Sequence, residues 1–230
     1  MKSKYKIKIE MLAFRLLMLA WIVACLPLMG NAQSDHNLNR EMQAISKPTS
    51  KWGWIDFTKE SNINPYTIFN DYKNAFELSN DDQMQFQKVI TDKKIGNNHY
   101  CYQQYYKGVK IDGAEFIVHQ KVDGKVKSAN GKIAVGLNLN VSPSISESEA
   151  LKILFDNYVD KTKGAWHDVQ REIELKESSK NSQATFYPKG ELLIHRIDLN
   201  QDIISDNLLL VWKFEVRVIP GANSLTYYID

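Results

Sequence analysis

The feature that most constrains the fold is a series of turn dipeptides that divides residues 82–131 into short segments. A glycine follows a polar residue four times in this stretch, at Lys107-Gly108, Asp112-Gly113, Asp123-Gly124 and Asn130-Gly131. Strand-like segments lie at residues 84–91, 99–106, 114–121 and 125–129, with a further turn at 94–98; residues 84–91 alternate with a period of two, and 99–106 are rich in tyrosine. Alternation with a period of two, interrupted by glycine turns, is typical of antiparallel strands joined by hairpins. The sequence therefore predicts an antiparallel meander with a turn at each dipeptide.

A helix is predicted directly before the meander. The segment 62–65 offers an N-cap followed by proline at the first helical position, and apolar residues then recur at helical spacing. They are Tyr66, Phe69, Tyr72, Ala75 and Phe76. This helix and the meander together predict a first α+β unit over residues 62–141.

The stretch before that unit, residues 33–61, is expected to be an extended lead-in. It is polar and lacks a sustained period, but Trp52, Trp54 and Phe57 alternate within it. Exposed aromatic side chains at this density are costly in water. We therefore expect them to form a short strand that docks on the body of the protein, with an interaction epitope as the alternative.

A second unit is predicted to begin after Pro143. Ser146 and Glu149 have the spacing of a capping box for a helix that continues through Tyr158. A polar stretch of low order around residues 176–182 separates this helix from strand-like runs at 185–187, 192–197, 208–218 and 225–229. The predicted fold class is therefore α+β, with two small units, 62–141 and 142–230, that each pack a helix on an antiparallel sheet.

The N-terminus has the layout of a secretory signal. A lysine-rich start precedes an apolar run over 16–29, and small residues precede Gln33. We predict a signal peptide over residues 1–32, cleaved between Ala32 and Gln33, and an extracellular or periplasmic location. The apolar run is too short to favour a membrane anchor. The alternative is a lipoprotein anchored at Cys25, because residues 22–25 resemble a lipobox.

The net charge excludes a nucleic-acid-binding role, and the cysteine content excludes an intrachain disulfide. Five basic residues and one acidic residue lie in 1–32, so the remaining 24 basic and 26 acidic residues give a net charge of −2. A slightly acidic chain lacks the basic footprint of nucleic-acid binding. Once Cys25 leaves with the signal, Cys101 is the remaining cysteine, so an intrachain disulfide is excluded. Cys101 is interpreted as a strand residue rather than a nucleophile.

The sequence also lacks the common catalytic motifs of exported hydrolases. None of the five histidines is followed by glutamate, and no HExxH, G-x-S-x-G, G-x-G-x-x-G or phosphate-loop pattern occurs. Paired carboxylates such as Asp81 and Asp82 lie in turn contexts. His99, His119 and His195 fall in predicted strands, where a structural role is the expectation. We predict that this chain is not itself an enzyme.

A specific resemblance lies within the meander. Residues 99–115 resemble the fungalysin/thermolysin propeptide motif, in which a tyrosine-rich strand ends in Gln-x-Tyr-x-Gly-Val and the next begins at Gly-Ala-Glu. The similarity continues, in order, through residues 116–119, 123–126 and 128–132. The motif positions that we take as candidate binding residues are Tyr102, Gln104, Tyr106, Gly108, Val109, Gly113 and His119, with structural roles as the stronger expectation for the glycines.

A second resemblance covers the C-terminal part. Residues 144–151, 185–188 and 210–216 resemble the start and later strands of a PepSY-type unit, which implies a cystatin-like or PepSY-like fold. Residues 227–230 are similar to the last propeptide strand of the family. Because the chain stops at Asp230 directly after an apolar strand, we expect this unit to be truncated at its C-terminal end.

The resemblance implies a role as the pro-region of a secreted thermolysin-like zinc metallopeptidase. Such pro-regions act as intramolecular chaperones and inhibitors of the catalytic domain. The implied partner is that catalytic domain, which would hold the zinc and the calcium, so no cofactor is expected in this chain. The alternative is a free-standing secreted protease inhibitor or envelope binding module that acts in trans.

Overall fold

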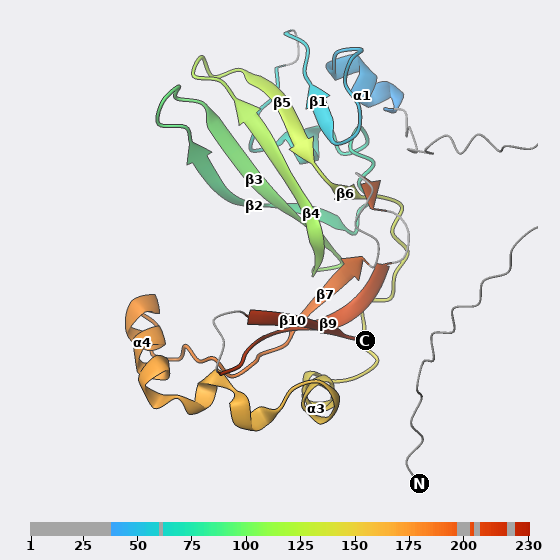
Figure 1. The fold of residues 1–230 in the computed structure, drawn as a ribbon. Helices are drawn as coiled ribbons and strands as arrows, with labels where there is room; N and C mark the ends of the chain where they lie inside the picture. The colour runs from blue at the N-terminus through green and yellow to red at the C-terminus, as the bar shows by residue number, and fades with distance from the viewer. Residues whose placement is uncertain (1–37, 60–61, 197–202, 205–207, 220–223) are drawn as a thin grey trace, which may run out of the picture. The chain divides into compact units, whose positions relative to one another are not determined.

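The computed structural model describes residues 38–59, 62–196, 203–204, 208–219 and 224–230 (Figure 1). Their helices are α1 (Arg40–Ile45), α2 (Ile68–Asp71), α3 (Glu147–Asn157) and α4 (Val169–Ser179), with 3-10 turns at Lys161–Lys163 and Ala165–His167. The strands are β1 (Trp54–Asp56), β2 (Asp82–Thr91), β3 (Asn98–Tyr106), β4 (Val109–Gln120), β5 (Val126–Gly131), β6 (Ile133–Ala134), β7 (Glu191–Arg196), β8 (Ile203–Ile204), β9 (Leu208–Arg217) and β10 (Ser224–Ile229).

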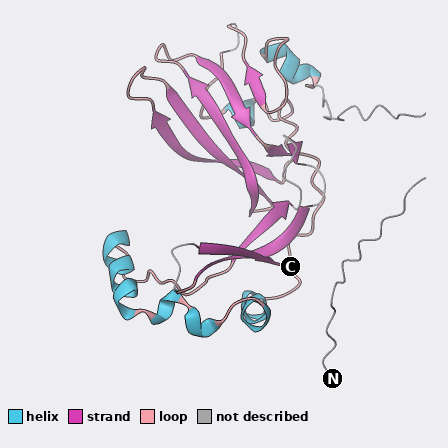
Figure 2. Ribbon diagram, in the orientation of Figure 1, coloured by secondary structure: helices cyan, strands magenta, loops and turns pink. Residues whose placement is uncertain are grey.

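The meander is confirmed as an antiparallel sheet. β2 pairs with β3, β3 with β4, and β4 with β5 (Figure 2). Tyr100, Tyr102 and Tyr106 on β3 point to one side and are buried. Cys101 and Tyr105 point to the other side and are half-buried, whereas Gln103 on that side is buried. The strand thus has an inner side on the core and an outer side that is more open, as the alternation predicts.

The predicted turn at Asp112-Gly113 is wrong, because β4 runs through it as one strand. Gln103 pairs with Glu115 and Tyr105 with Lys110, so residues 111–114 of β4 lie opposite a single residue of β3. This is a β-bulge, and Gly113 adopts a φ of +73°, a conformation that glycine reaches without strain. The same dipeptide that favours a hairpin turn therefore serves here to bend a continuous strand.

Beyond the bulge, the sheet continues into the C-terminal part of the chain. Lys110 and Ile111 of β4 pair in parallel with Leu193 and Ile194 of β7. β7 pairs antiparallel with β9, and β9 with β10. The mixed α+β class is confirmed, and so are the strands predicted at 192–197, 208–218 and 225–229. The eight-stranded sheet passes through both predicted units, so the arrangement as two separate helix-on-sheet units is not confirmed.

The expected lead-in, residues 33–61, contains a helix that its polar sequence does not indicate, in addition to the predicted strand. α1 begins after Asn39, whose side chain accepts a hydrogen bond from the main-chain N–H of Met42. The predicted docking strand is confirmed as β1, which pairs with β5, and Trp52 and Phe57 are buried beside it. Trp54 remains 48% exposed on the outer side.

The long helix predicted from residue 65 is reduced to the four residues of α2, followed by turns. Its aromatic residues are nevertheless buried, since Phe69 and Phe76 both contact Phe116 of β4 edge to face. Aromatic residues are weak helix formers, and packing against the sheet overrides the helical period here.

In the C-terminal part, α3 is confirmed together with its capping box. Ser146 Oγ accepts from the N–H of Glu149, whose carboxylate accepts from the N–H of Ser146. Ala150 and Leu154 pack with Phe214 and Val216 of β9.

Two other predictions for the C-terminal part are wrong. α4 occupies part of the stretch expected to lack order. None of its residues is buried, so no apolar face that packs on the core marked this helix in the sequence. Residues 185–187 do not form a strand. Phe186 and Tyr187 form bends, and Glu172 accepts a hydrogen bond from the N–H of Phe186.

Gln104 joins the meander to the segment that follows it. Its side chain is fully buried, accepts from the N–H of Ala134 at 2.8 Å and donates to the carbonyl of Ala134 at 2.8 Å. It also donates to the carboxylate of Asp82 at 2.9 Å. One amide thus satisfies three polar groups in the interior, where unpaired groups are costly.

We expect Gln104→Leu to lower the free energy of unfolding by about 2–4 kcal/mol, since it leaves Asp82 and Ala134 without these partners. Urea denaturation followed by circular dichroism measures the change. The matched control is Gln85→Leu on the exposed side of β2, which should change stability by less than about 0.5 kcal/mol. Equal stability of the two variants would contradict the role given to Gln104.

Gly131 ends β5 where the main chain approaches β4 closely. Its φ is +149°, and an added Cβ would lie 2.1 Å from the carbonyl oxygen of Glu115 and 2.6 Å from Cα of Phe116. Gly131→Ala should therefore destabilise the protein by about 2–4 kcal/mol through strain and overlap. Gly124→Ala is the control, because that turn glycine has a positive φ with open space around it and should cost about 1 kcal/mol. Thermal denaturation of the two variants tests the difference, and similar losses would argue against the close approach.

Candidate functional site: the outer sheet side and the bulge of β4

Three of the candidate binding residues lie on the inner side of the sheet. Tyr102, Gln104 and Tyr106 are 3%, 0% and 2% exposed, so their side chains have little surface with which to contact another molecule. The hydroxyl of Tyr102 donates to the carbonyl of Pro65, and burial raises the pKa of Tyr102 to about 12. The hydroxyl of Tyr106 donates to the carbonyl of Leu137 at 3.1 Å. These contacts give the three residues structural roles.

Three further candidates lie at the start of β4. Gly108 lies in the turn between β3 and β4, and Val109 is the first residue of β4. Val109 is half-buried against the small core around Ile111 and Ile194. Gly113 lies in the bulge. Together they set the path by which the chain leaves β3 and enters the bent strand, and a binding role for them stays a prediction.

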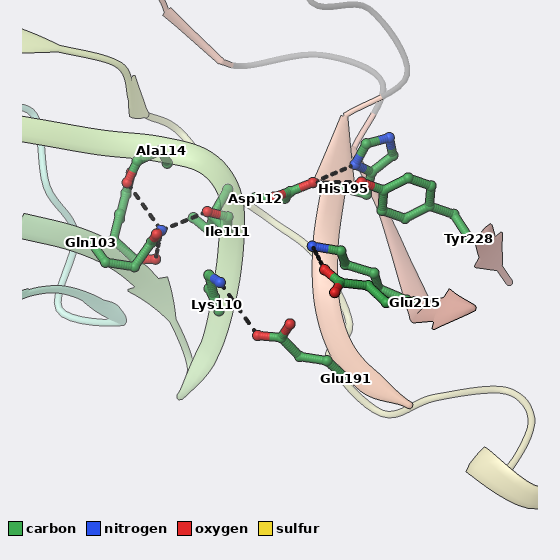
Figure 3. Close-up of polar contacts among 11 residues, drawn as sticks. Gln103, Lys110, Ile111, Asp112, Ala114, Glu191, His195, Glu215 and Tyr228 are labelled. Atoms are coloured by element: carbon green, nitrogen blue, oxygen red, sulfur yellow. Dashed lines mark hydrogen bonds and ion pairs between the residues drawn. The ribbon is translucent and has the colours of Figure 1, made fainter. Parts of the chain in front are cut away.

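The bulge is held by Gln103, which the sequence analysis did not single out. The side-chain amide of Gln103 is 5% exposed and donates to the carbonyls of Ile111 at 2.7 Å and Ala114 at 3.1 Å (Figure 3). It also contacts the carbonyl of its neighbour Gln104 at 3.1 Å. A bulge frees main-chain carbonyls from the strand ladder, and this amide supplies them with a donor.

The bulge also carries an acidic side chain toward the C-terminal strands. Asp112 Oδ2 accepts from His195 Nδ1 of β7 at 3.0 Å and from the hydroxyl of Tyr228 of β10 at 3.1 Å (Figure 3). The rings of His195 and Tyr228 stack with centroids 3.8 Å apart. Desolvation, and then the nearby Asp112 carboxylate, raise the pKa of Tyr228.

Sequence reasoning missed this cluster, because its members lie 83 and 116 residues apart in the chain. No local spacing signals such a contact. Next to it, Lys110 forms an ion pair with Glu191 at 3.4 Å, and both side chains are partly exposed. Such a pair contributes less than about 1 kcal/mol to stability. We therefore interpret it as a contact that helps to fix the register of β4 and β7. The cluster links β4, β7 and β10.

On the outer side, β2, β3 and β4 border a hollow of about 520 Å³. Ile90, Cys101 and Ile117 give it an apolar part, and Lys88, Lys110 and Glu115 contribute charged groups. Ile90 is 48% exposed. An apolar patch rimmed by charges on an otherwise polar surface is typical of contact surfaces in proteins. This side of the sheet is the candidate contact surface.

His119, the remaining candidate, lies on β4 directly opposite His99 of β3. Their Nδ1 atoms are 2.7 Å apart, and His119 is half-buried between His99, Asn130 and Trp54. Desolvation lowers the pKa of His119. The expected structural role thus involves a specific pair of rings, which the sequence analysis placed in neighbouring strands without pairing them.

The described residues include no group of three or more His, Cys, Asp or Glu side chains that could hold a metal ion. They also include no helix long and apolar enough to cross a membrane. The predicted cleavage site at Ala32 and Gln33, and Cys25 of the lipobox-like segment, lie outside the described residues, so those interpretations stay predictions.

Comparison with known proteins adds two findings. Residues 82–133, from the start of β2 to β6, match the family model of the Fungalysin/Thermolysin Propeptide Motif. The chain is also 28% identical over 172 residues to Neutral protease B of Bacillus subtilis (strain 168). That match covers 74% of this chain but 28% of the relative, so the chain spans less than a third of the length of the protein it resembles.

The match coincides with the sheet described above. It covers all seven candidate motif positions, including the buried tyrosines, Gln104 and His119. It also includes Gln103 and the bulge at 111–114. The resemblance of residues 142–230 to a PepSY-type unit stays a prediction. Residues 82–133 are therefore similar to the fungalysin/thermolysin propeptide motif, in a chain that is also similar to part of a bacterial neutral protease.

Proposed function

We propose that this chain is the pro-region of a secreted thermolysin-like zinc metallopeptidase and that it acts as a chaperone and inhibitor of the catalytic domain. The observation that carries the proposal is the family match at residues 82–133, whose motif residues lie together in one folded sheet. The similarity to Neutral protease B over 172 residues supports it. The catalytic domain is the proposed partner, and zinc and calcium would belong to that domain.

The physical basis of this role is a folded surface and requires no reacting residue. A surface that binds the native catalytic domain and not its unfolded chain stabilises the native domain by mass action. If the same surface covers the substrate cleft, it also prevents cleavage until the pro-region is removed. The outer side of β2, β3 and β4, with its partly apolar hollow, is the surface that we propose for this contact.

The remaining features follow from the same proposal. Residues 1–32 would be a signal peptide that directs export, residues 33–61 the lead-in, and residues 62–141 and 142–230 the two propeptide units, the second PepSY-like. An anchor at Cys25 is the alternative to a free extracellular or periplasmic form. A free-standing inhibitor that acts in trans would use the same surface. An inhibition assay therefore tests the inhibition of a peptidase that both hypotheses predict.

The first prediction concerns inhibition. Purified residues 33–230 should slow peptide cleavage by a thermolysin-like metallopeptidase at near-stoichiometric ratio, and Neutral protease B is the first enzyme to test because this chain is 28% identical to part of it. The same protein should raise the recovery of active enzyme after dilution from denaturant, because it stabilises the native catalytic domain. Full protease activity at tenfold excess of intact chain would contradict the inhibitory role.

The second prediction locates the contact. Ile90→Asp places a charge on the apolar part of the hollow, which a bound partner would have to desolvate, and should raise the inhibition constant at least about tenfold. Val122→Asp is the matched control, since Val122 is 76% exposed in the turn after β4 and does not line the hollow. Titration of the enzyme with each variant measures the constants. Equal constants for the two variants would place the contact elsewhere.

A further inference from the structure

A basic hollow lies where the turn between β4 and β5 meets the segments on either side of β1. Its volume is about 380 Å³, and five of its lining residues are lysines, whereas one is acidic, Asp123. The lysines, which define what we call the lysine hollow, are Lys47, Lys59, Lys121, Lys125 and Lys127. The described lining thus carries a net charge of +4, although residues 33–230 together carry −2.

The five ammonium groups are available to a ligand. None of them forms an ion pair with a carboxylate of the described residues, and all five lysines are exposed. The single carboxylate of the lining is engaged by the turn, because Asp123 Oδ1 accepts from the N–H of Lys125 at 3.0 Å. Cations gathered around one hollow repel each other, and a bound anion relieves that repulsion. The lysine hollow is therefore suited to bind negative charge.

The walls of the lysine hollow are joined by main-chain hydrogen bonds. The N–H of Lys47 donates to the carbonyl of Asp56 at 2.8 Å, and the N–H of Phe57 donates to the carbonyl of Lys127 at 2.9 Å. The turn over residues 121–125 is closed by a hydrogen bond of 2.9 Å between the N–H of its first residue and the carbonyl of its last. Four of the lysine side chains therefore start from one fixed frame, so the positive charge is gathered before a ligand binds.

The floor of the lysine hollow is apolar and indicates the kind of anion. Phe57, Ile63 and Val126 line the hollow and are buried. A peptide segment with acidic side chains offers carboxylates to the lysines and aliphatic carbons to this floor. All five cations are lysines, whereas the planar fork of arginine is best suited to bidentate contacts with phosphate. A concave site of this size admits part of a peptide and does not match a flat membrane surface.

We propose that the lysine hollow binds an extended peptide segment of a partner protein that carries several carboxylates. The ammonium groups pair with the carboxylates, and the aliphatic parts of the segment contact the apolar floor. The lysine hollow shares no lining residue with the hollow on the outer side of β2, β3 and β4. The proposal does not depend on the pro-region role, so binding by the chain alone tests it.

The experiment is titration of the purified chain with a hexaglutamate peptide that is acetylated and amidated at its ends, measured by calorimetry at low ionic strength. Combined Lys47→Gln, Lys125→Gln and Lys127→Gln should weaken binding at least about tenfold. The matched control combines Lys93→Gln, Lys94→Gln and Lys176→Gln, which replace three exposed lysines outside the hollow and give the same net charge. Its affinity should stay within about twofold of the unmodified chain, since exposed charges farther away than about 10 Å are screened.

Asp123→Asn tests the proposal in the opposite direction. Asparagine keeps an Oδ1 acceptor for the N–H of Lys125, and Asn-Gly suits the same tight turns as Asp-Gly. The variant therefore removes the carboxylate that repels an acidic ligand and retains the turn. Hexaglutamate binding should tighten about two- to threefold, with no change in the urea midpoint.

Three results would overturn the proposal. The first is an equal loss of affinity in the two triple variants, because net charge alone would then explain the binding. The second is unchanged affinity in Asp123→Asn. The third comes from co-sedimentation with phosphatidylglycerol vesicles. If the vesicles bind through the lysines of the hollow while hexaglutamate does not bind, the ligand is a membrane surface and the assignment to an acidic peptide is wrong.

Discussion

The structure depends on two neighbouring glutamines whose amides are both buried on opposite sides of one strand. Side chains alternate along β3, so Gln104 enters the inner side while Gln103 enters the outer side near β7. Burial of an amide without partners is costly, and each of the two amides finds partners in main-chain groups of neighbouring segments. Gln104 thereby fixes the segment after the meander, and Gln103 fixes the bulge of β4.

The bulge determines how the rest of the chain joins the sheet. Residues 116–120 of β4 pair with β5, and Lys110 and Ile111 pair with β7, so β4 pairs with two segments that are far apart in sequence. Asp112 projects from the bulge and receives His195 and Tyr228, which brings the last described strand into the same arrangement (Figure 3). The motif residues therefore divide by location. Tyr102, Gln104 and Tyr106 on the inner side hold the fold, whereas His119 lies half-buried beside His99 on the outer side, the side that also carries the partly apolar hollow.

Much of this could be predicted from the sequence where the signal is local. Glycine dipeptides and alternating residues located β3, β4, β5, β7, β9 and β10, and the spacing of Ser146 and Glu149 located α3. The failures share one cause, which is tertiary packing. Asp112-Gly113 has turn chemistry but forms a bulge because Gln103 is placed to hold it, and the aromatic residues after Pro65 pack on Phe116 instead of completing a helix. The polar groups that join distant strands belong to Gln103, Asp112 and His195. No local spacing in the sequence predicts their contacts.

The parallel ladder between β4 and β7 has a consequence for the order of folding. The hairpins of the meander join residues close in sequence, whereas the pairing of Lys110 with Leu193 closes a loop of 83 residues for two residue pairs of ladder. Closing a long loop costs more chain entropy than closing a hairpin, and non-local pairs form late in most small domains. Because synthesis proceeds from the N-terminus, the meander and its bulge can be complete before β7 leaves the ribosome. The bent edge of β4 then serves as a template on which the later strands assemble.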